Sequence, residues 1–87
     1  DVVGLDPVDL QQEILLYPNP AQNAVRYDSE VKLDKIVLRN MLGQEILIID
    51  QPAAKAEIDL SQLANDIYLI SFISENGIWT QKLVVRK

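Results

Sequence analysis

The sequence predicts an all-β domain, a sandwich of about seven short, mainly antiparallel strands with at most one helical turn. Short runs of β-branched and apolar residues recur along the chain, and turn signals separate them at a spacing of about ten residues. No segment keeps the hydrophobic period of about 3.6 residues that a helical bundle needs. The 87 residues are the length of one small domain. Together these observations favour an immunoglobulin-like sandwich with one core.

The beginning of the chain predicts a linker followed by two strands. Residues 1–12 are acidic and weakly patterned, so we expect them to be a linker and residues 13–87 to be the folded domain. The first strand is predicted at residues 13–16 and stops at Pro18, since a proline supplies no N–H to a strand ladder. A second strand is predicted at residues 24–27, where apolar and polar residues alternate.

The middle of the chain predicts a hairpin. Residues 35–39 and 45–49 are rich in β-branched and other apolar residues, and the loop between them contains one glycine, Gly43. We expect this glycine to hold a positive φ in the hairpin turn. The charged stretch before the hairpin, residues 28–34, is ambiguous and has room for a short strand at residues 31–33.

The next segment predicts a short extended piece and then one helical turn. A short strand or bridge is expected at residues 57–59. A single helical turn is expected at residues 59–63, because Asp59 and Ser61 are both residue types that cap a helix.

The last part of the chain predicts a long hairpin. Residues 67–74 are apolar on both faces, which indicates a central strand. Residues 78–86 pair back across Asn76-Gly77, a dipeptide that suits a type I′ turn. The last strand divides its side chains between two faces: Trp79, Leu83 and Val85 on one, and Ile78, Thr80, Lys82, Val84 and Arg86 on the other.

The composition excludes several classes of function. The chain has no cysteine and no histidine, which rules out disulfides, thiolate metal sites and histidine-dependent acid–base catalysis. A net charge of −5 argues against nucleic acid as a partner, because phosphate binding needs a basic surface. The longest apolar runs are four residues, far short of a membrane span. The chain begins with Asp1 and shows no leader, so we expect it to be a piece of a longer protein.

Some residues could carry chemistry, but each has a simpler structural interpretation. Asp28, Glu30 and Asp34 could hold calcium, yet they lack the spacing of a calcium loop and suit a solvated surface. Trp79 and Tyr68 could stack on a sugar, although aromatic residues in strands usually belong to the core. A small hydrolase is supported only by the carboxylates, which are the candidate acid–base groups of this chain. We therefore predict no enzyme and no cofactor. The alternative is an accessory module that binds a glycan or a surface protein through Trp79 or Tyr68.

Four segments, taken in order, resemble a known family. They are residues 16–21 (Leu-Tyr-Pro-Asn-Pro-Ala), residues 36–45, residues 58–68 and residues 82–87 (Lys-Leu-Val-Val-Arg-Lys). Each segment alone is a weak match, but their order and spacing resemble the C-terminal sorting domain of the type IX (Por) secretion system of Bacteroidetes. The resemblance covers residues 14–87.

Particular residues carry the resemblance over to this chain. The opening motif falls on Tyr17, Pro18, Asn19 and Pro20, where the two prolines make a stiff, extended connector. The family's Asp-x-x-Gly-type turn falls on Asn40 to Gly43, with asparagine in the first place. A Gly-x-Tyr element falls on Asp66 to Tyr68, with aspartate in place of the glycine. The basic end of the family falls on the residues that we expect to be recognised: Lys82, Leu83, Val84, Val85, Arg86 and Lys87.

The resemblance implies a non-catalytic secretion signal attached to an N-terminal cargo domain in the same precursor. It implies that the precursor passes through the periplasm and crosses the outer membrane through the type IX translocon, to the cell surface or the medium. A sortase-like peptidase would then cleave the signal within the acidic linker.

The physics of the last strand suits recognition. A strand at a sheet edge exposes backbone groups to which a receptor can add a strand, and two isolated copies can pair in the same way. Lys82, Arg86 and Lys87 would steer the domain toward an acidic partner. The structural alternative is that these charges only protect an edge strand against aggregation.

Overall fold

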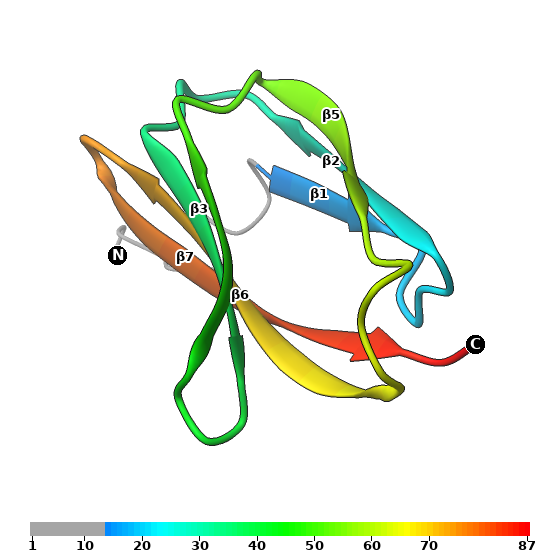
Figure 1. The fold of residues 1–87 in the computed structure, drawn as a ribbon. Coiled ribbons are helices and arrows are strands. Elements are labelled where there is room, and N and C mark those ends of the chain that lie inside the picture. Colours follow the sequence, from blue (N-terminus) through cyan, green and yellow to red (C-terminus); the bar gives the residue numbers. More distant parts are fainter. Residues whose placement is uncertain (1–13) are drawn as a thin grey trace, which may run out of the picture.

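Short runs of β-branched and aromatic residues form the strands of this chain. The computed structural model describes residues 14–87, and within them there are seven strands in two antiparallel sheets and no helix (Figure 1). The predicted linker, residues 1–12, and Glu13 of the predicted first strand lie outside the described residues. The described part of the chain has no helix with the length and hydropathy needed to cross a membrane.

The two sheets enclose the core between them. The first has three strands, in the order β1 (Ile14–Tyr17), β2 (Ala24–Ser29) and β5 (Lys55–Asp59). The second has four, in the order β4 (Glu45–Asp50), β3 (Lys35–Asn40), β6 (Asp66–Ser74) and β7 (Gly77–Val85). This is an immunoglobulin-like arrangement in which the fourth strand pairs with the third instead of the fifth. The predicted fold class is confirmed.

The core forms because alternate residues of the central strands point inward. Phe72 of β6 lies between Ile36 of β3 and Trp79 of β7 in the register of the sheet, and all three are buried. The three-stranded sheet covers this layer from the opposite side with a buried set that includes Ile14, Val25, Tyr27 and Ile58. The predicted central position of the strand around Phe72 is confirmed, and its second face points outward, where Ile67 is 38% exposed.

The stretch after β2 differs from the prediction. Residues 31–33 form no strand. The Ser29 hydroxyl accepts the Val31 N–H at 3.1 Å and donates to the Val31 carbonyl at 2.7 Å. Both backbone groups of Val31 thus have a hydrogen-bond partner in a bend, without pairing to another strand. Leu33 is nevertheless buried at 1% exposure, so this loop contributes to the core without being a strand.

The predicted helical turn at residues 59–63 is also wrong. Asp59 is the last residue of β5, and one hydrogen bond of 3.0 Å from the Leu63 N–H to the Leu60 carbonyl closes a turn. Leu60 is fully buried, and its N–H donates to the Asn23 carbonyl at 2.8 Å. These tertiary contacts hold the chain in a turn that does not continue into a helix.

The first hairpin follows its sequence signal. Gly43 has a φ of 90°, as predicted for the β3–β4 turn. Asn40 orders the same turn, because its side-chain oxygen accepts the N–H groups of Leu42 at 2.9 Å and Gln44 at 3.0 Å. The family resemblance places Asn40 first in this turn, and the structure shows that its side chain orders the turn through these two hydrogen bonds.

The second hairpin forms with a different turn from the one predicted. The two turn residues are Glu75 and Asn76, because Ser74 and Gly77 are paired in the ladder. A type I′ turn needs positive φ at both central residues. Gln51 is the one described non-glycine residue with a positive φ, so the predicted type I′ turn at Asn76-Gly77 is wrong.

Tyr27 links the two sheets in the middle of the core. Its ring centroid lies 5.8 Å from that of Phe72, and its hydroxyl donates to the Ala53 carbonyl at 2.7 Å. Burial raises the pKa of the Tyr27 hydroxyl above the ordinary value of 10.0, because the charged phenolate is poorly solvated there.

Replacement of Tyr27 by phenylalanine is expected to lower the free energy of unfolding by about 1 kcal/mol at neutral pH, since one hydrogen bond is lost. The stability that depends on the neutral phenol is full below pH 10.0 and falls as the pH rises through the folded-state pKa, because the unfolded chain ionises first. Urea denaturation of both proteins at neutral pH and at about pH 11 checks this. The stability difference between them should shrink at the higher pH, and an unchanged difference would contradict the assignment.

Candidate functional site

The Tyr17-Pro18-Asn19-Pro20 motif carries the chain from one sheet to the other. Tyr17 ends β1, and the peptide bonds that precede both prolines are cis. After the motif, Ala21 lies beside Val85 of β7 in a parallel bridge. The motif therefore connects the three-stranded sheet to the edge of the four-stranded sheet. We call residues 19–21 the edge clip.

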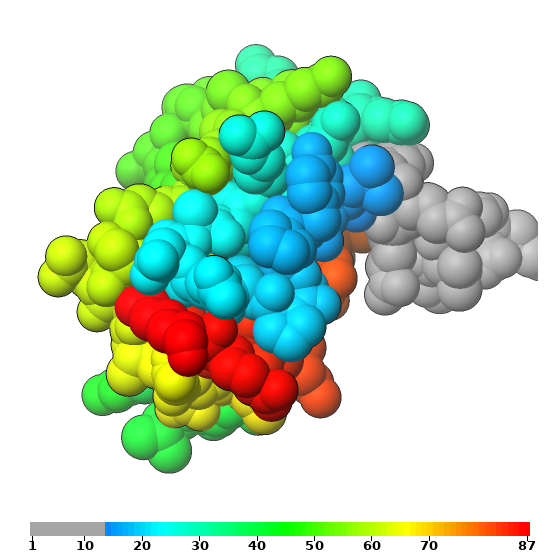
Figure 2. All heavy atoms as spheres, turned by 90° about the vertical axis from the view of Figure 1, so that its right-hand side faces the viewer, coloured from blue at the N-terminus to red at the C-terminus, as the bar shows by residue number. Residues whose placement is uncertain are grey.

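The edge clip occupies the outer edge of the C-terminal half of β7. The Asn19 side chain donates to the Lys82 carbonyl at 2.9 Å and accepts the Val84 N–H at 3.1 Å. The Ala21 N–H donates to the Val84 carbonyl at 2.7 Å, and the Ala21 carbonyl accepts the Arg86 N–H at 2.8 Å. Figure 2 shows the last residues of the chain (red) lying against the segment that follows β1 (blue to cyan). Four hydrogen bonds thus hold this end of β7.

The turn after β5 holds the end of the chain from its other side. The Lys87 N–H donates to the side-chain oxygen of Asn65 at 3.0 Å, and the Lys87 ammonium donates to the carbonyls of Ser61 at 3.0 Å and Leu63 at 2.6 Å. In the same turn, the Ser61 N–H donates to Asp59 at 2.9 Å, and it lowers the pKa of the Asp59 carboxyl below 3.8 together with the Ser61 hydroxyl and the charge of Lys87. Lys87 therefore has an anchoring role that sequence reasoning did not predict.

The predicted signal, residues 82–87, contains both anchored and exposed side chains. Leu83 and Val85 are at most 2% exposed and belong to the core. Lys82 and Arg86 are exposed, and neither belongs to the four ion pairs found among residues 14–87. Of this stretch, the side chains of Lys82 and Arg86 are thus the cations that a partner can approach without breaking an internal contact.

An apolar and basic surface surrounds Lys82 on the outer face of the four-stranded sheet. In the sheet register Lys82 lies opposite Leu69, which lies opposite Arg39, and Val84 lies opposite Ile67. We call these five residues the outer patch. Ile67 is 38% exposed, while Leu69 and Val84 are half-buried. Sequence reasoning named Lys82 and Val84 as site residues but missed Arg39, Ile67 and Leu69. The apolar residues on both faces of the predicted strand at 67–74 were a signal for the last two.

The Asp66 to Tyr68 element supports the same end of the sandwich. Tyr68 is buried, and its hydroxyl donates to the Ala64 carbonyl at 2.7 Å. Asp66 begins β6 opposite Val85, and its φ is not positive, so aspartate in the family's glycine position has no backbone penalty here. Gly43, by contrast, is a turn residue of the β3–β4 hairpin.

The alternative sugar-stacking site is not accessible. Trp79 is 6% exposed and Tyr68 is 5% exposed, so both rings belong to the core and have no open face. The indole N–H of Trp79 is buried and has no hydrogen-bond partner in the described part of the chain. The prediction of an accessory module that binds through these two aromatic residues is therefore wrong.

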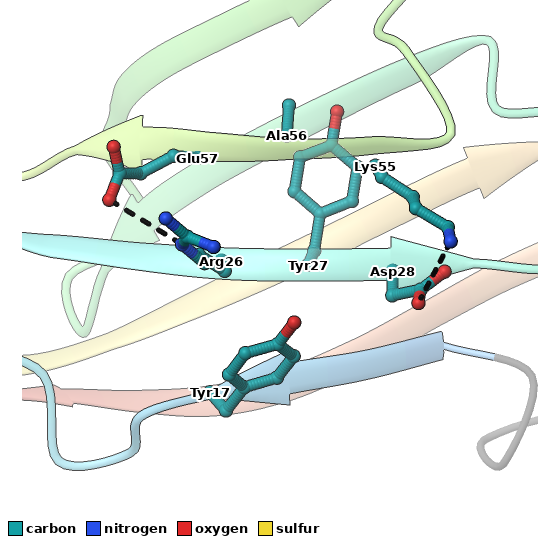
Figure 3. Close-up of a pocket in the computed structure, with 7 residues that line it drawn as sticks. All are labelled: Tyr17, Arg26, Tyr27, Asp28, Lys55, Ala56 and Glu57. Atoms are coloured by element: carbon teal, nitrogen blue, oxygen red, sulfur yellow. Dashed lines mark ion pairs between the residues drawn. The ribbon is translucent and has the colours of Figure 1, made fainter.

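A hollow on the outer face of the three-stranded sheet contains the exposed ring of Tyr17. It has a volume of about 330 Å³, and Figure 3 shows its lining side chains on β1, β2 and β5. The charged side chains there pair with each other, Arg26 with Glu57 at 3.7 Å and Asp28 with Lys55 at 3.8 Å. Within residues 14–87 no three acidic side chains gather in a way that could hold a metal ion. The hollow therefore shows no charge that is left for a ligand.

Asn19→Ala is expected to loosen the end of β7 and to leave the sandwich folded. The variant loses two hydrogen bonds, so the free energy of unfolding should fall by about 1–2 kcal/mol. Amide hydrogen exchange measured by NMR should become faster at Val84 and stay slow at Phe72, in the middle of the sheet. The matched control is Asn23→Ala, because the Asn23 side chain makes no hydrogen bond to any described residue. Unchanged exchange at Val84 in the Asn19 variant would contradict the bridging role of this side chain.

The fold and the site define a small β-sandwich whose C-terminal end is anchored on both sides and carries exposed basic charges. A comparison with protein families matches residues 15–86 to the secretion system C-terminal sorting domain. The chain belongs to this family, the C-terminal sorting domains of type IX secretion, whose members are non-catalytic tags recognised by the secretion machinery as part of a cargo precursor. Comparisons with curated proteins and with solved structures gave no significant match.

Proposed function

We propose that residues 13–87 are the sorting signal of an exported precursor and that residues 82–87 are the part that the type IX machinery recognises. The observation that carries this proposal is the family match over residues 15–86. The contacts around the C-terminal end support it, because they hold the backbone in one position while the charges of Lys82 and Arg86 stay exposed. A fixed backbone lowers the entropy lost when a partner binds.

In this proposal, the precursor reaches the periplasm with its N-terminal cargo, and the translocon carries it across the outer membrane to the cell surface or the medium. A sortase-like peptidase then cuts within residues 1–12 and separates the cargo from the folded domain. The domain contributes recognition, and this role requires no catalytic residue and no cofactor. Residues 1–12 suit cleavage because they precede the matched segment and hold three aspartates and no basic residue.

A secretion assay tests the proposal. Residues 1–87 are fused to the C-terminus of a cysteine-free periplasmic reporter and expressed in a strain that has the type IX system. We expect the reporter at the cell surface or in the medium, and a strain without the translocon should keep it in the periplasm. A reporter that stays in the periplasm of both strains, with the domain intact and resistant to protease, would overturn the proposal.

A further inference from the structure

The edge clip restricts how the C-terminal end of β7 can be recognised. Strand addition would use the backbone groups that point away from β6. Four of these groups are already bonded within the domain: the Lys82 carbonyl, both backbone groups of Val84 and the Arg86 N–H. A receptor strand would have to displace Asn19 and Ala21 before it could pair here. Strand addition, which the sequence suggested for this strand, would therefore have to occur at an edge whose backbone groups are already hydrogen-bonded.

The outer patch at the same end needs no such displacement. It consists of Arg39, Ile67, Leu69, Lys82 and Val84, and its residues lie side by side in the register of three neighbouring strands. Arg39 has a partner in Glu45 at 3.2 Å, whereas Lys82 is in none of the ion pairs of residues 14–87. The patch thus combines a positive charge that no ion pair among the described residues compensates with apolar side chains, on a chain whose net charge is −5.

We propose that the sorting machinery recognises the C-terminal end of β7 through the outer patch, while the edge clip stays hydrogen-bonded to that strand. The surface that fits it is that of a folded protein, with a carboxylate facing Lys82 and apolar side chains facing Ile67 and Leu69. Complementary charge favours such a surface over a neutral one, and burial of the apolar side chains adds affinity. This inference rests on the proposed function and adds the surface and the chemistry of the partner.

A disulfide lock separates this mode of recognition from strand addition. Ala21 and Val85 are bridge partners, and neighbouring strands lie about 4.8 Å apart, within the range of Cα separations that a disulfide spans. The chain has no cysteine of its own, so Ala21→Cys with Val85→Cys can form one intramolecular bond. The oxidising periplasm allows that bond to form. The lock keeps the edge clip on β7 during export.

We expect the locked fusion to be exported as efficiently as the two single-cysteine variants, with the disulfide intact in the exported protein. Export of the single variants but not of the locked protein would overturn the inference, because the edge would then have to open. If the unmodified fusion stays in the periplasm, the proposed function itself fails, and that result is distinct from a failure of the lock alone.

Asn19→Ala supplies an independent arm that does not depend on forming the disulfide. The variant frees part of the edge of β7. If the machinery recognises the domain with the edge clip bonded, export should fall by about tenfold, which corresponds to a loss of about 1.4 kcal/mol in binding free energy. Strand addition predicts unchanged or higher export from the same variant, and that outcome would overturn the inference. Asn23→Ala is again the matched control.

Two isoleucines on the outer face test the patch itself. Ile67→Ser removes an apolar side chain of the outer patch, whereas Ile78→Ser removes a more exposed one, 65% against 38%, at the other end of β7. We expect export to fall in the Ile67 variant only, with unchanged thermal unfolding in both. Normal export of the Ile67 variant would overturn the assignment. A dimer of the isolated domain that Ile67→Ser dissociates in sedimentation experiments would assign the patch to a second copy and would also overturn it.

Discussion

Replacement of both Lys82 and Arg86 by glutamate is expected to stop export while the domain remains folded. Both side chains are exposed and lie outside the ion pairs of residues 14–87, so the free energy of unfolding should change by no more than about 0.5 kcal/mol. A partner surface that attracts these two cations would instead face two like charges, and such contacts cost several kcal/mol. We therefore expect export of the reporter fusion to fall by more than about a hundredfold.

The control for this variant carries the same change in net charge at another place. Lys32→Glu with Lys55→Glu also takes the net charge from −5 to −9, since each replacement changes it by −2. Both lysines are exposed and lie outside residues 82–87, and the surface ion pair of Lys55 with Asp28 that the control removes contributes no more than about 1 kcal/mol. Export of the control should remain near that of the wild type. Equal loss of export in both variants would mean that net charge matters and that the position of Lys82 and Arg86 does not.

Charge reversal is a sharper test than truncation at this end of the chain. Removal of Lys87 would also remove its hydrogen bonds to the carbonyls of Ser61 and Leu63. A truncated protein that failed to be exported would therefore leave two explanations, loss of the signal and loss of the anchor. The glutamate variants keep every hydrogen bond that the Lys82 and Arg86 backbones make with the edge clip.

Phe72→Ala is expected to have the largest effect on stability. Phe72 is 1% exposed, lies in strand β6 of the four-stranded sheet and contacts the three-stranded sheet through the ring of Tyr27. Removal of a buried phenylalanine costs about 3–5 kcal/mol, because apolar contacts are lost and a cavity remains. Domains of this kind have a total free energy of unfolding of only about 5–15 kcal/mol. The variant should therefore lose a large part of its stability, and a domain at the lower end of that range would be partly unfolded and less well exported.

Urea denaturation of the isolated domain, followed by tryptophan fluorescence, measures this effect because Trp79 is buried beside the substituted position. Ile78→Ala is the control, since Ile78 is 65% exposed and its truncation should change stability by about 0.5 kcal/mol or less. A loss of less than about 1 kcal/mol in Phe72→Ala would contradict the packing of β6 between β3 and β7.

In the two hairpins, the sequence predicted the strands correctly but predicted only one of the two turns. Runs such as 35–39 and 67–74 contain mostly side chains that favour strands, and Gly43 is the residue that a positive φ requires, so local chemistry and tertiary structure agree there. The turn type around Asn76 was mispredicted because a shift of one residue decides which two residues are central, and the pairing of Ser74 with Gly77 makes them Glu75 and Asn76. Such a choice depends on the partner strand.

The segment from Leu60 to Leu63 shows the opposite case. Its composition suits a helix cap, but Leu60 is buried and its N–H is bonded to the carbonyl of Asn23, 37 positions earlier in the chain (60 − 23). Burial of Leu60 and this bond fix the start of the segment, and the chain closes one turn at Leu63 without continuing into a helix. Long-range contacts thus outweighed a local preference that is small, on the order of 1 kcal/mol.

The sequence by itself determined the β-sandwich, the family and the end of the chain that carries the basic residues, because periodicity, turn residues and the order of motifs are properties of the linear chain and need no knowledge of its contacts. It also indicated a stiff connector at Tyr17-Pro18-Asn19-Pro20. Only the tertiary structure showed that this connector lies on β7 and that Asn19 bonds to Lys82 and Val84, more than sixty residues away. Hydrogen bonds between distant residues leave no periodic trace in a sequence, since they depend on how two sheets come together.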